Sequence, residues 1–148
     1  SCIDGGLMKN DQDNSNSTIL VADDEEYIVR VVAFKLRGAG YEVIEAVDGE
    51  DAWSKIREGG IDLVLTDHQM PFMTGLELAG RVADEPKTAH IPVLMLTARG
   101  FRLDAEEIVA SRIVELIAKP FSPRVLLERV RATLAQWNGE HGMREEAA

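Results

Sequence analysis

The stretch Ile61-Asp-Leu-Val-Leu-Thr-Asp67-His-Gln-Met-Pro71 constrains the fold more than any other part of the chain. Its first five residues, all apolar except one, are typical of a strand that is buried on both faces of a sheet. A strand ending at Thr66 holds the carboxylate of Asp67 in a defined direction, and Pro71 ends the strand pairing soon afterwards. We therefore treat Asp67 as the residue around which the other polar groups should be placed.

Composition indicates one soluble globular domain. The chain has 148 residues, of which 45% are hydrophobic and 28% charged, so it is long and apolar enough to bury a core. No apolar run approaches the ~20 residues of a membrane span, and no signal-peptide pattern begins the chain. The single cysteine, Cys2, excludes an intrachain disulfide and fits a cytoplasmic location. The net charge of −10 argues against direct binding to nucleic acid, because phosphate backbones bind basic surfaces.

The chain divides into a folded unit between two tails. Residues 1–17 are rich in Asn, Asp, Ser and Gly and are expected to form a disordered tail, and residues 138–148 a frayed C-terminal tail. Within the folded unit, 18–137, we expect strands over residues 18–22, 41–45, 61–66, 93–97 and 113–118. We expect helices over residues 25–38, between Asp48-Gly49 and Gly59-Gly60, from Thr74 onward, over 101–110, and from Ser122 to about Trp137.

Five strands alternating with five helices predict an α/β fold with a parallel sheet, because every crossover then contains a helix. Right-handed crossovers place helices on both faces of the sheet, which is the doubly wound, flavodoxin-like arrangement. If the strand order is 2-1-3-4-5, the order reverses between the first and third strands. Ligands of open α/β folds bind at such a reversal, outside the carboxyl ends of the strands.

Polar residues collect at those carboxyl ends. Asp23 and Asp24 follow the first strand, Asp67 the third and Lys119 the fifth, while Thr97 ends the fourth. Three converging carboxylates repel one another, and Mg²⁺ is a natural compensation because it prefers a few carboxylates and retains several waters. A lysine supplies a point charge for a phosphate oxygen, and a hydroxyl can donate to the same group. Together these groups describe phosphoryl transfer to an aspartate.

Each of these residues also has a purely structural interpretation. The two aspartates after the first strand could be helix caps, and Asp67 could belong to an Asx turn. Thr97 could be an ordinary strand residue and Lys119 a solvated strand end. The functional hypothesis depends on all five residues meeting in one crevice.

The motifs resemble the receiver domain of bacterial two-component response regulators over about residues 18–137. The segments that carry the resemblance are Ile19-Leu-Val-Ala-Asp-Asp24-Glu, Asp48-Gly49, Leu65-Thr-Asp67-x-x-Met70-Pro71, Gly75-Leu-Glu-Leu78, Leu96-Thr97-Ala98 and Lys119-Pro120-Phe121. Taken together this set is highly specific.

The resemblance implies a role for each residue of the metal site. Asp67 would accept a phosphoryl group from a sensor histidine kinase or phosphotransfer protein. Asp24 and Asp67 would coordinate Mg²⁺ together with the backbone carbonyl of Gln69, and Asp23 would act through a bound water.

The resemblance also implies how the signal leaves the site. Lys119 would contact the phosphoryl group and precede a cis peptide bond to Pro120, and Thr97 would move onto the phosphoryl group. The family usually carries Tyr or Phe three residues before the lysine, as a partner of the moving threonine, whereas this chain has Leu116. The aromatic part of that switch is therefore missing.

We expect a stand-alone, chemotaxis-regulator-like receiver, monomeric or weakly dimeric, that switches binding to a downstream protein target. It would be no enzyme beyond accepting and losing its own phosphoryl group. Three alternatives stay open: a receiver excised from a longer regulator or hybrid kinase, a receiver-like module that binds partners without phosphorylation, and a metal-dependent hydrolase with an aspartate nucleophile. The common pattern of such hydrolases has a second Asp two residues after the nucleophile, where this chain has Gln69.

Overall fold

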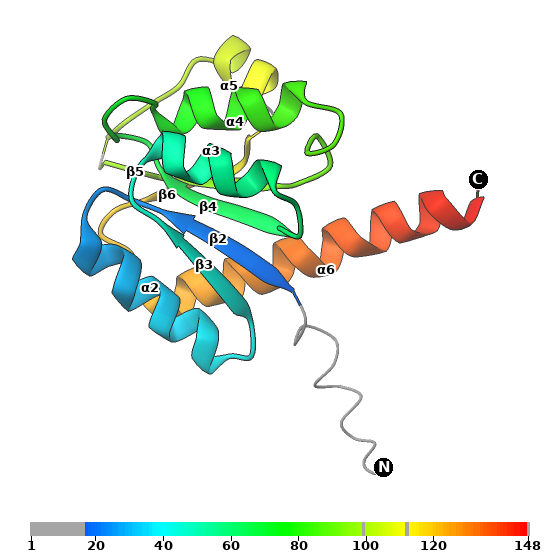
Figure 1. The fold of residues 1–148 in the computed structure, drawn as a ribbon, viewed down its shortest axis with the longest axis horizontal. Helices are drawn as coiled ribbons and strands as arrows, with labels where there is room; N and C mark the ends of the chain where they lie inside the picture. Colours follow the sequence, from blue (N-terminus) through cyan, green and yellow to red (C-terminus); the bar gives the residue numbers. More distant parts are fainter. Residues whose placement is uncertain (1–16, 99, 112, 148) are drawn as a thin grey trace.

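Five parallel strands form one sheet at the centre of the molecule (Figure 1). The computed structural model describes residues 17–98, 100–111 and 113–147, with side chains except at residue 108 and residues 138–147. The strands are β2 (Thr18–Ala22), β3 (Glu42–Ala46), β4 (Leu63–Asp67), β5 (Val93–Thr97) and β6 (Ile113–Ala118). Their order is β3-β2-β4-β5-β6, which confirms the predicted 2-1-3-4-5 topology.

Helices cover both faces of the sheet (Figure 1). They are α2 (Glu26–Gly38), α3 (Gly49–Arg57), α4 (Gly75–Asp84), α5 (Ala105–Ser111) and α6 (Pro123–Ala147). The side chains of β2 alternate between two cores: Leu20 packs with α3 and α4, whereas Ile19 and Val21 pack with α2 and α6. All five residues of β4 are buried, as expected for a strand with helices on both sides.

Most element ends match the sequence-based expectation because they coincide with capping residues. Asp48 accepts from the backbone N–H of Asp51 at the start of α3, and Thr74 forms a reciprocal capping box with Glu77 at the start of α4. Strands β2, β5 and β6 have the predicted bounds, whereas β3 lies one residue later than expected.

Two helix predictions need correction. The helix expected over 101–110 begins at Ala105, because Asp104 and Glu107 exchange side-chain to backbone hydrogen bonds and start it there. Helix α6 begins at the predicted Pro123 but continues to Ala147 instead of ending near Trp137. No proline follows Pro123 in the sequence, so nothing there blocks the backbone ladder of the helix.

The expected N-terminal tail, except Ser17, lies outside the described residues. Ser17 accepts from the backbone N–H of Glu42 and so already belongs to the edge of the sheet. Within the described part of the chain, no helix combines the length and the apolar character needed to cross a membrane.

Candidate functional site

Four strands lead into polar residues at the same edge of the sheet. Asp67 ends β4 and Thr97 ends β5, while Asp23 and Lys119 directly follow β2 and β6. The register keeps these ends level, since Thr97 pairs with the residue before Lys119 and its carbonyl accepts from the Lys119 N–H at 2.7 Å. The parallel topology therefore brings together the residues that the sequence places far apart.

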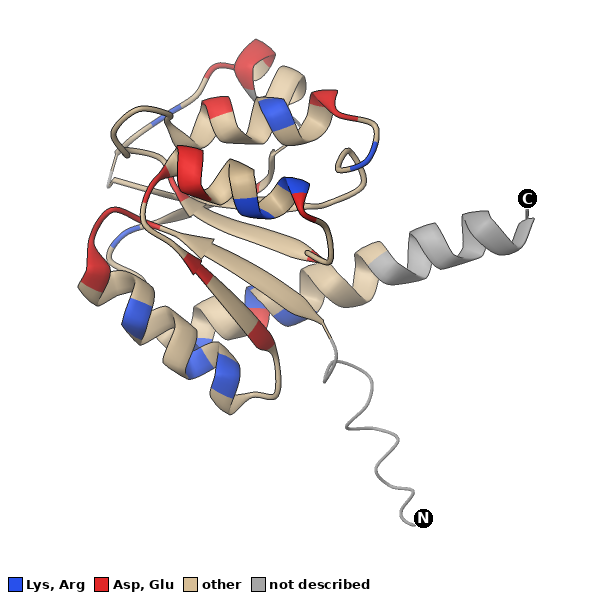
Figure 2. Cartoon of the chain, viewed as in Figure 1, with Lys and Arg blue, Asp and Glu red and all other residues tan. Residues whose placement is uncertain are grey.

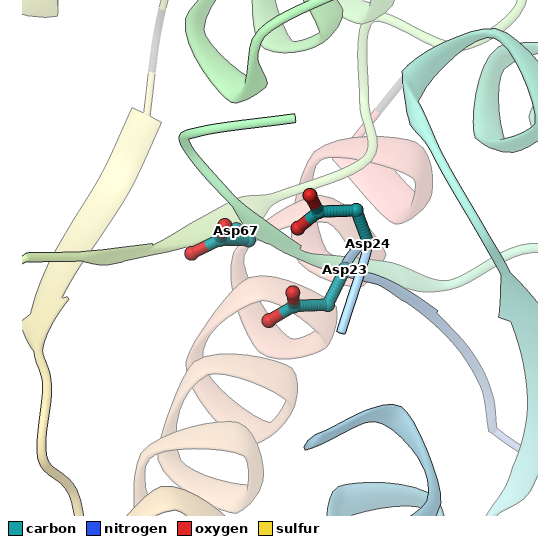
Figure 3. A group of neighbouring side chains, drawn as sticks. All are labelled: Asp23, Asp24 and Asp67. Atoms are coloured by element: carbon teal, nitrogen blue, oxygen red, sulfur yellow. The ribbon is translucent and has the colours of Figure 1, made fainter. Parts of the chain in front are cut away.

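Three carboxylates form the centre of the site. One oxygen each of Asp23, Asp24 and Asp67 lies within 4.8 Å of the others, and Figure 3 shows the three side chains gathered beyond the ends of β2 and β4. Asp23 and Asp67 are buried, with 1% and 6% of their surface exposed, whereas Asp24 is exposed. Acidic residues continue into the segment that leads to α2 (Figure 2). The cluster thus combines two buried oxygen donors with one that faces solvent.

Lys119 supplies the positive charge of the site. Its Nζ lies 2.9 Å from Oδ1 of Asp67, 3.4 Å from Oδ2 of Asp23 and 4.0 Å from Oε1 of Glu25. The peptide bond between Lys119 and Pro120 is cis, as the resemblance implied. The ammonium group of Lys119 is thus closest to the carboxylate of Asp67.

Burial shapes the titration of this cluster. Burial raises the pKa of Asp23 from 3.8 to about 6, and the negative charge of Asp67 adds to that rise. The N–H of Glu25, which donates to Asp23, and the charge of Lys119 act in the opposite direction without cancelling it. Burial alone lowers the pKa of Lys119, but its hydrogen bond to Asp67 and the charges of both buried aspartates outweigh this, so that pKa is raised. The cluster therefore holds more negative charge than its own lysine compensates.

The capping interpretation of the first two aspartates is wrong. The residue at the N-cap of α2 is Glu25, and it makes no side-chain capping bond. Asp23 uses one oxygen to accept from the Glu25 N–H at 2.9 Å, and its other oxygen faces Lys119. Neither contact involves Asp24, whose exposed carboxylate stays available to a ligand of the cluster.

Thr97 and Gln69 lie in different surroundings. Thr97 is 3% exposed at the end of β5, so its hydroxyl is held close to the protein interior. Gln69 is exposed in the segment between β4 and α4, two residues after Asp67. The roles assigned to both residues from the resemblance stay predictions.

Two further residues at the site were not assigned a role from the sequence. A Cβ atom at Gly75 would lie 2.4 Å from the backbone oxygen of Asp67, so only glycine allows the start of α4 to approach this closely. His68 follows Asp67 and stacks against Phe101. Gly75 belongs to the Gly75-Leu-Glu-Leu78 segment that carries the family resemblance, so the sequence offered a reason to expect that this position requires glycine. The ring contact joins His68 and Phe101, which belong to no common motif.

Comparisons with known proteins agree on one family. The model of the response regulator receiver domain matches residues 19–131. The phosphate regulon transcriptional regulatory protein PhoB of Pseudomonas aeruginosa is 39% identical over 117 residues, covering 79% of this chain and 51% of that protein. The alkaline phosphatase synthesis transcriptional regulatory protein PhoP of Bacillus subtilis is 37% identical over 119 residues, covering 80% and 49%. The chain thus spans about half the length of the curated relatives it matches.

Solved structures share the fold over nearly their whole length. The chemotaxis response regulator CheY4 of Vibrio cholerae superposes with a TM-score of 0.73 at 33% identity, covering 78% of this chain and 97% of that one. The response regulator TrrA of Thermotoga maritima, solved in complex with Mg²⁺ and BeF, gives a TM-score of 0.70 at 34% identity with the same coverage.

Proposed function

The chain belongs to the response regulator receiver domain family, and on that premise we propose that Asp67 accepts a phosphoryl group from the phosphohistidine of a sensor histidine kinase or phosphotransfer protein. The observation that carries the proposal is the contact of Lys119 with Asp67, at 2.9 Å, inside a cluster of three carboxylates. A structural ion pair alone would not need the two further aspartates.

In the proposed reaction the Asp67 carboxylate is the nucleophile. One of its oxygens bonds to phosphorus while the bond from phosphorus to the donor's imidazole nitrogen breaks, and that nitrogen keeps the electron pair. Lys119 lies where its ammonium can pass from the carboxylate to an oxygen of the arriving phosphoryl group. The buried end of β4 fixes the direction of the nucleophile, so positioning supplies much of the rate.

The carboxylate cluster fits a divalent cation. Asp23, Asp24 and Asp67 offer oxygen donors within 4.8 Å of one another, which is the chemistry that Mg²⁺ prefers, and the excess negative charge favours a cation. We propose that Asp24 and Asp67 hold it with the backbone carbonyl of Gln69, and Asp23 through a water. When bound, Mg²⁺ neutralises charge on the transferring group. The complex of TrrA with Mg²⁺ and BeF supports this assignment by analogy.

Thr97 and the neighbouring strand end would report the modification. We propose that the Thr97 hydroxyl donates a hydrogen bond to the phosphoryl group and that the resulting shift changes binding to a downstream protein. Thr97 is buried one strand away from Asp67, and its carbonyl already holds the backbone of Lys119. A shift of Thr97 would therefore move two of the site's groups together.

Intact mass spectrometry tests the proposal. The chain is incubated with acetyl phosphate and Mg²⁺, alongside Asp67→Asn and Asp62→Asn, the second being a control at an exposed aspartate of the same segment. We expect one phosphoryl group per chain on the parent and on the Asp62 variant and none on the Asp67 variant. Absence of the adduct on the parent chain would refute the proposal. Sustained release of phosphate without an adduct would favour a hydrolase instead.

A further inference from the structure

An aromatic contact links the phosphoacceptor strand to the segment that follows Thr97. The rings of His68 and Phe101 lie 4.6 Å apart between centroids, at an interplanar angle of 39°. His68 immediately follows Asp67, and Phe101 lies between the end of β5 and the start of α5. The contact thus joins the segment that follows β4 to the segment that follows β5.

The backbone of His68 is held on two sides. Its N–H donates to the carbonyl of Leu96 on β5 at 3.0 Å, and its carbonyl accepts from the N–H of Gly75 at the start of α4 at 2.8 Å. The backbone that carries the imidazole is therefore held by both β5 and the start of α4.

Phe101 lies in the short turn that follows β5. Its N–H donates to the carbonyl of Ala98 at 3.0 Å, and the intervening Gly100 has φ +82°, a conformation that glycine adopts freely. The phenyl ring is half-buried against the core cluster on the α3 and α4 side of the sheet, together with Leu103 and Leu116. One backbone hydrogen bond thus ties Phe101 to Ala98, the residue that follows Thr97.

The contact also leaves a polar atom unsatisfied. Among the residues whose side chains are described, Nδ1 of His68 is buried and has no hydrogen-bond partner. An unpaired buried nitrogen costs free energy, so the ring contact exists despite a polar penalty and not because of one.

Resting on the proposed function, we propose that His68 is a positioning residue that couples phosphorylation of Asp67 to Phe101 and so to α5. A phosphoryl group adds bulk and negative charge at the end of β4, and a shift of Thr97 toward it draws the Ala98 turn along. Phe101 then moves relative to the ring of His68, and the segment that leads into α5 moves with it. Leu116, an aliphatic side chain in the same cluster, offers no ring for this purpose.

The test compares exchange before and after phosphorylation. Amide hydrogen–deuterium exchange of the peptide spanning residues 100–111 is measured with Mg²⁺, with and without acetyl phosphate, and the adduct is quantified in the same samples. The variants are His68→Ala and Phe101→Leu, which lose the ring pair, and His68→Phe, which keeps two rings but removes the polar nitrogen. The reported quantity is the change caused by phosphorylation, because a purely structural loosening would alter both states alike.

We expect phosphorylation to change the amide exchange rate of this peptide about threefold or more in the parent chain, which is the factor that the free energy of one aromatic pair would produce. His68→Ala and Phe101→Leu should acquire the adduct but lose most of that change, and His68→Phe should recover it. A change of parent size in both ring-deficient variants would overturn the coupling while leaving the proposed function intact. A parent chain without an adduct would overturn both, and the mass measurement separates the two failures.

Discussion

Replacing Asp23 by Asn tests whether the site carries uncompensated charge. The Asp23 carboxyl is 1% exposed, and its pKa of about 6 in the folded chain compares with 3.8 for the free group. Burial is the main cause of that rise, and the negative charge of Asp67 adds to it. Ionising Asp23 therefore works against folding when no cation is bound.

The sign and size of the effect follow from linkage. A carboxyl whose pKa is raised on folding contributes stability that is fully present below pH 3.8 and is lost as the pH rises through about 6. The shift corresponds to ~3 kcal/mol across that window. Asn cannot ionise, so the stability of Asp23→Asn relative to the parent should rise by ~2.5 kcal/mol from pH 4 to pH 8, the remainder of the window lying below pH 4. The attraction of Lys119 for the ionised carboxylate is already included in the pKa of about 6, so it adds no separate trend.

Urea denaturation with EDTA, followed by the fluorescence of Trp53 and Trp137, measures the free energy of unfolding at each pH. The control is Asp84→Asn, an exposed aspartate at the end of α4, which should show no such trend. Mg²⁺ at pH 8 should stabilise the parent and stabilise Asp23→Asn much less, because ligand binding adds to folding stability. A difference between Asp23→Asn and the parent that stays flat from pH 4 to pH 8 would refute the reasoning.

Two backbone predictions use matched pairs. Gly75→Ala should destabilise the chain by about 2 kcal/mol or more and reduce phosphoryl acceptance, because the added Cβ would press on the Asp67 backbone. Gly80→Ala has open space around the added Cβ and should stabilise the chain by about 0.5–1 kcal/mol. Thermal denaturation measures the stability of both variants, and intact mass measures their phosphoryl adduct. Phe72 is 79% exposed at φ 72°, so Phe72→Gly should stabilise by about 0.5–1 kcal/mol, whereas Phe34→Gly within α2 should destabilise by about 1 kcal/mol. Equal effects within either pair, measured by urea denaturation, would contradict the backbone explanation.

The convergence of the site could be predicted because topology, not detailed packing, produces it. Strands β2 and β5 are mostly apolar runs, and β6, which is apolar except at Glu115, ends directly before Lys119-Pro120, so the sequence indicates where these strands end. A parallel sheet then places every such end on one edge. This rule places Asp67 and Lys119 on the same edge, whereas their 2.9 Å contact also requires the lysine side chain to reach past β5, which lies between their strands.

The features that escaped prediction depend on side chains meeting across the fold. His68 and Phe101 share no periodicity, and nothing in either segment alone indicates that their rings face each other. The start of α5 was missed because the cap at Asp104 separates Phe101 and Leu103 from the helix, which was expected over residues 101–110. Those two side chains pack on the core from a loop rather than from a helix, which periodicity cannot distinguish.

The charge balance of the site connects its stability to its proposed reaction. One lysine lies within 4.0 Å of the carboxylates of Asp23, Glu25 and Asp67, so the unmodified cluster is already short of positive charge. Phosphorylation would replace the single negative charge of the Asp67 carboxylate by the ~1.5 to 2 negative charges of a phosphoryl group at the same strand end. Because Lys119 cannot compensate both states, the phosphorylated site should depend on a divalent cation more than the unmodified one does. The burial that raises the pKa of Asp23 would then favour the reaction. In a site that water solvates poorly, a bound cation and correctly placed charges stabilise the transferring group more strongly than they would in water.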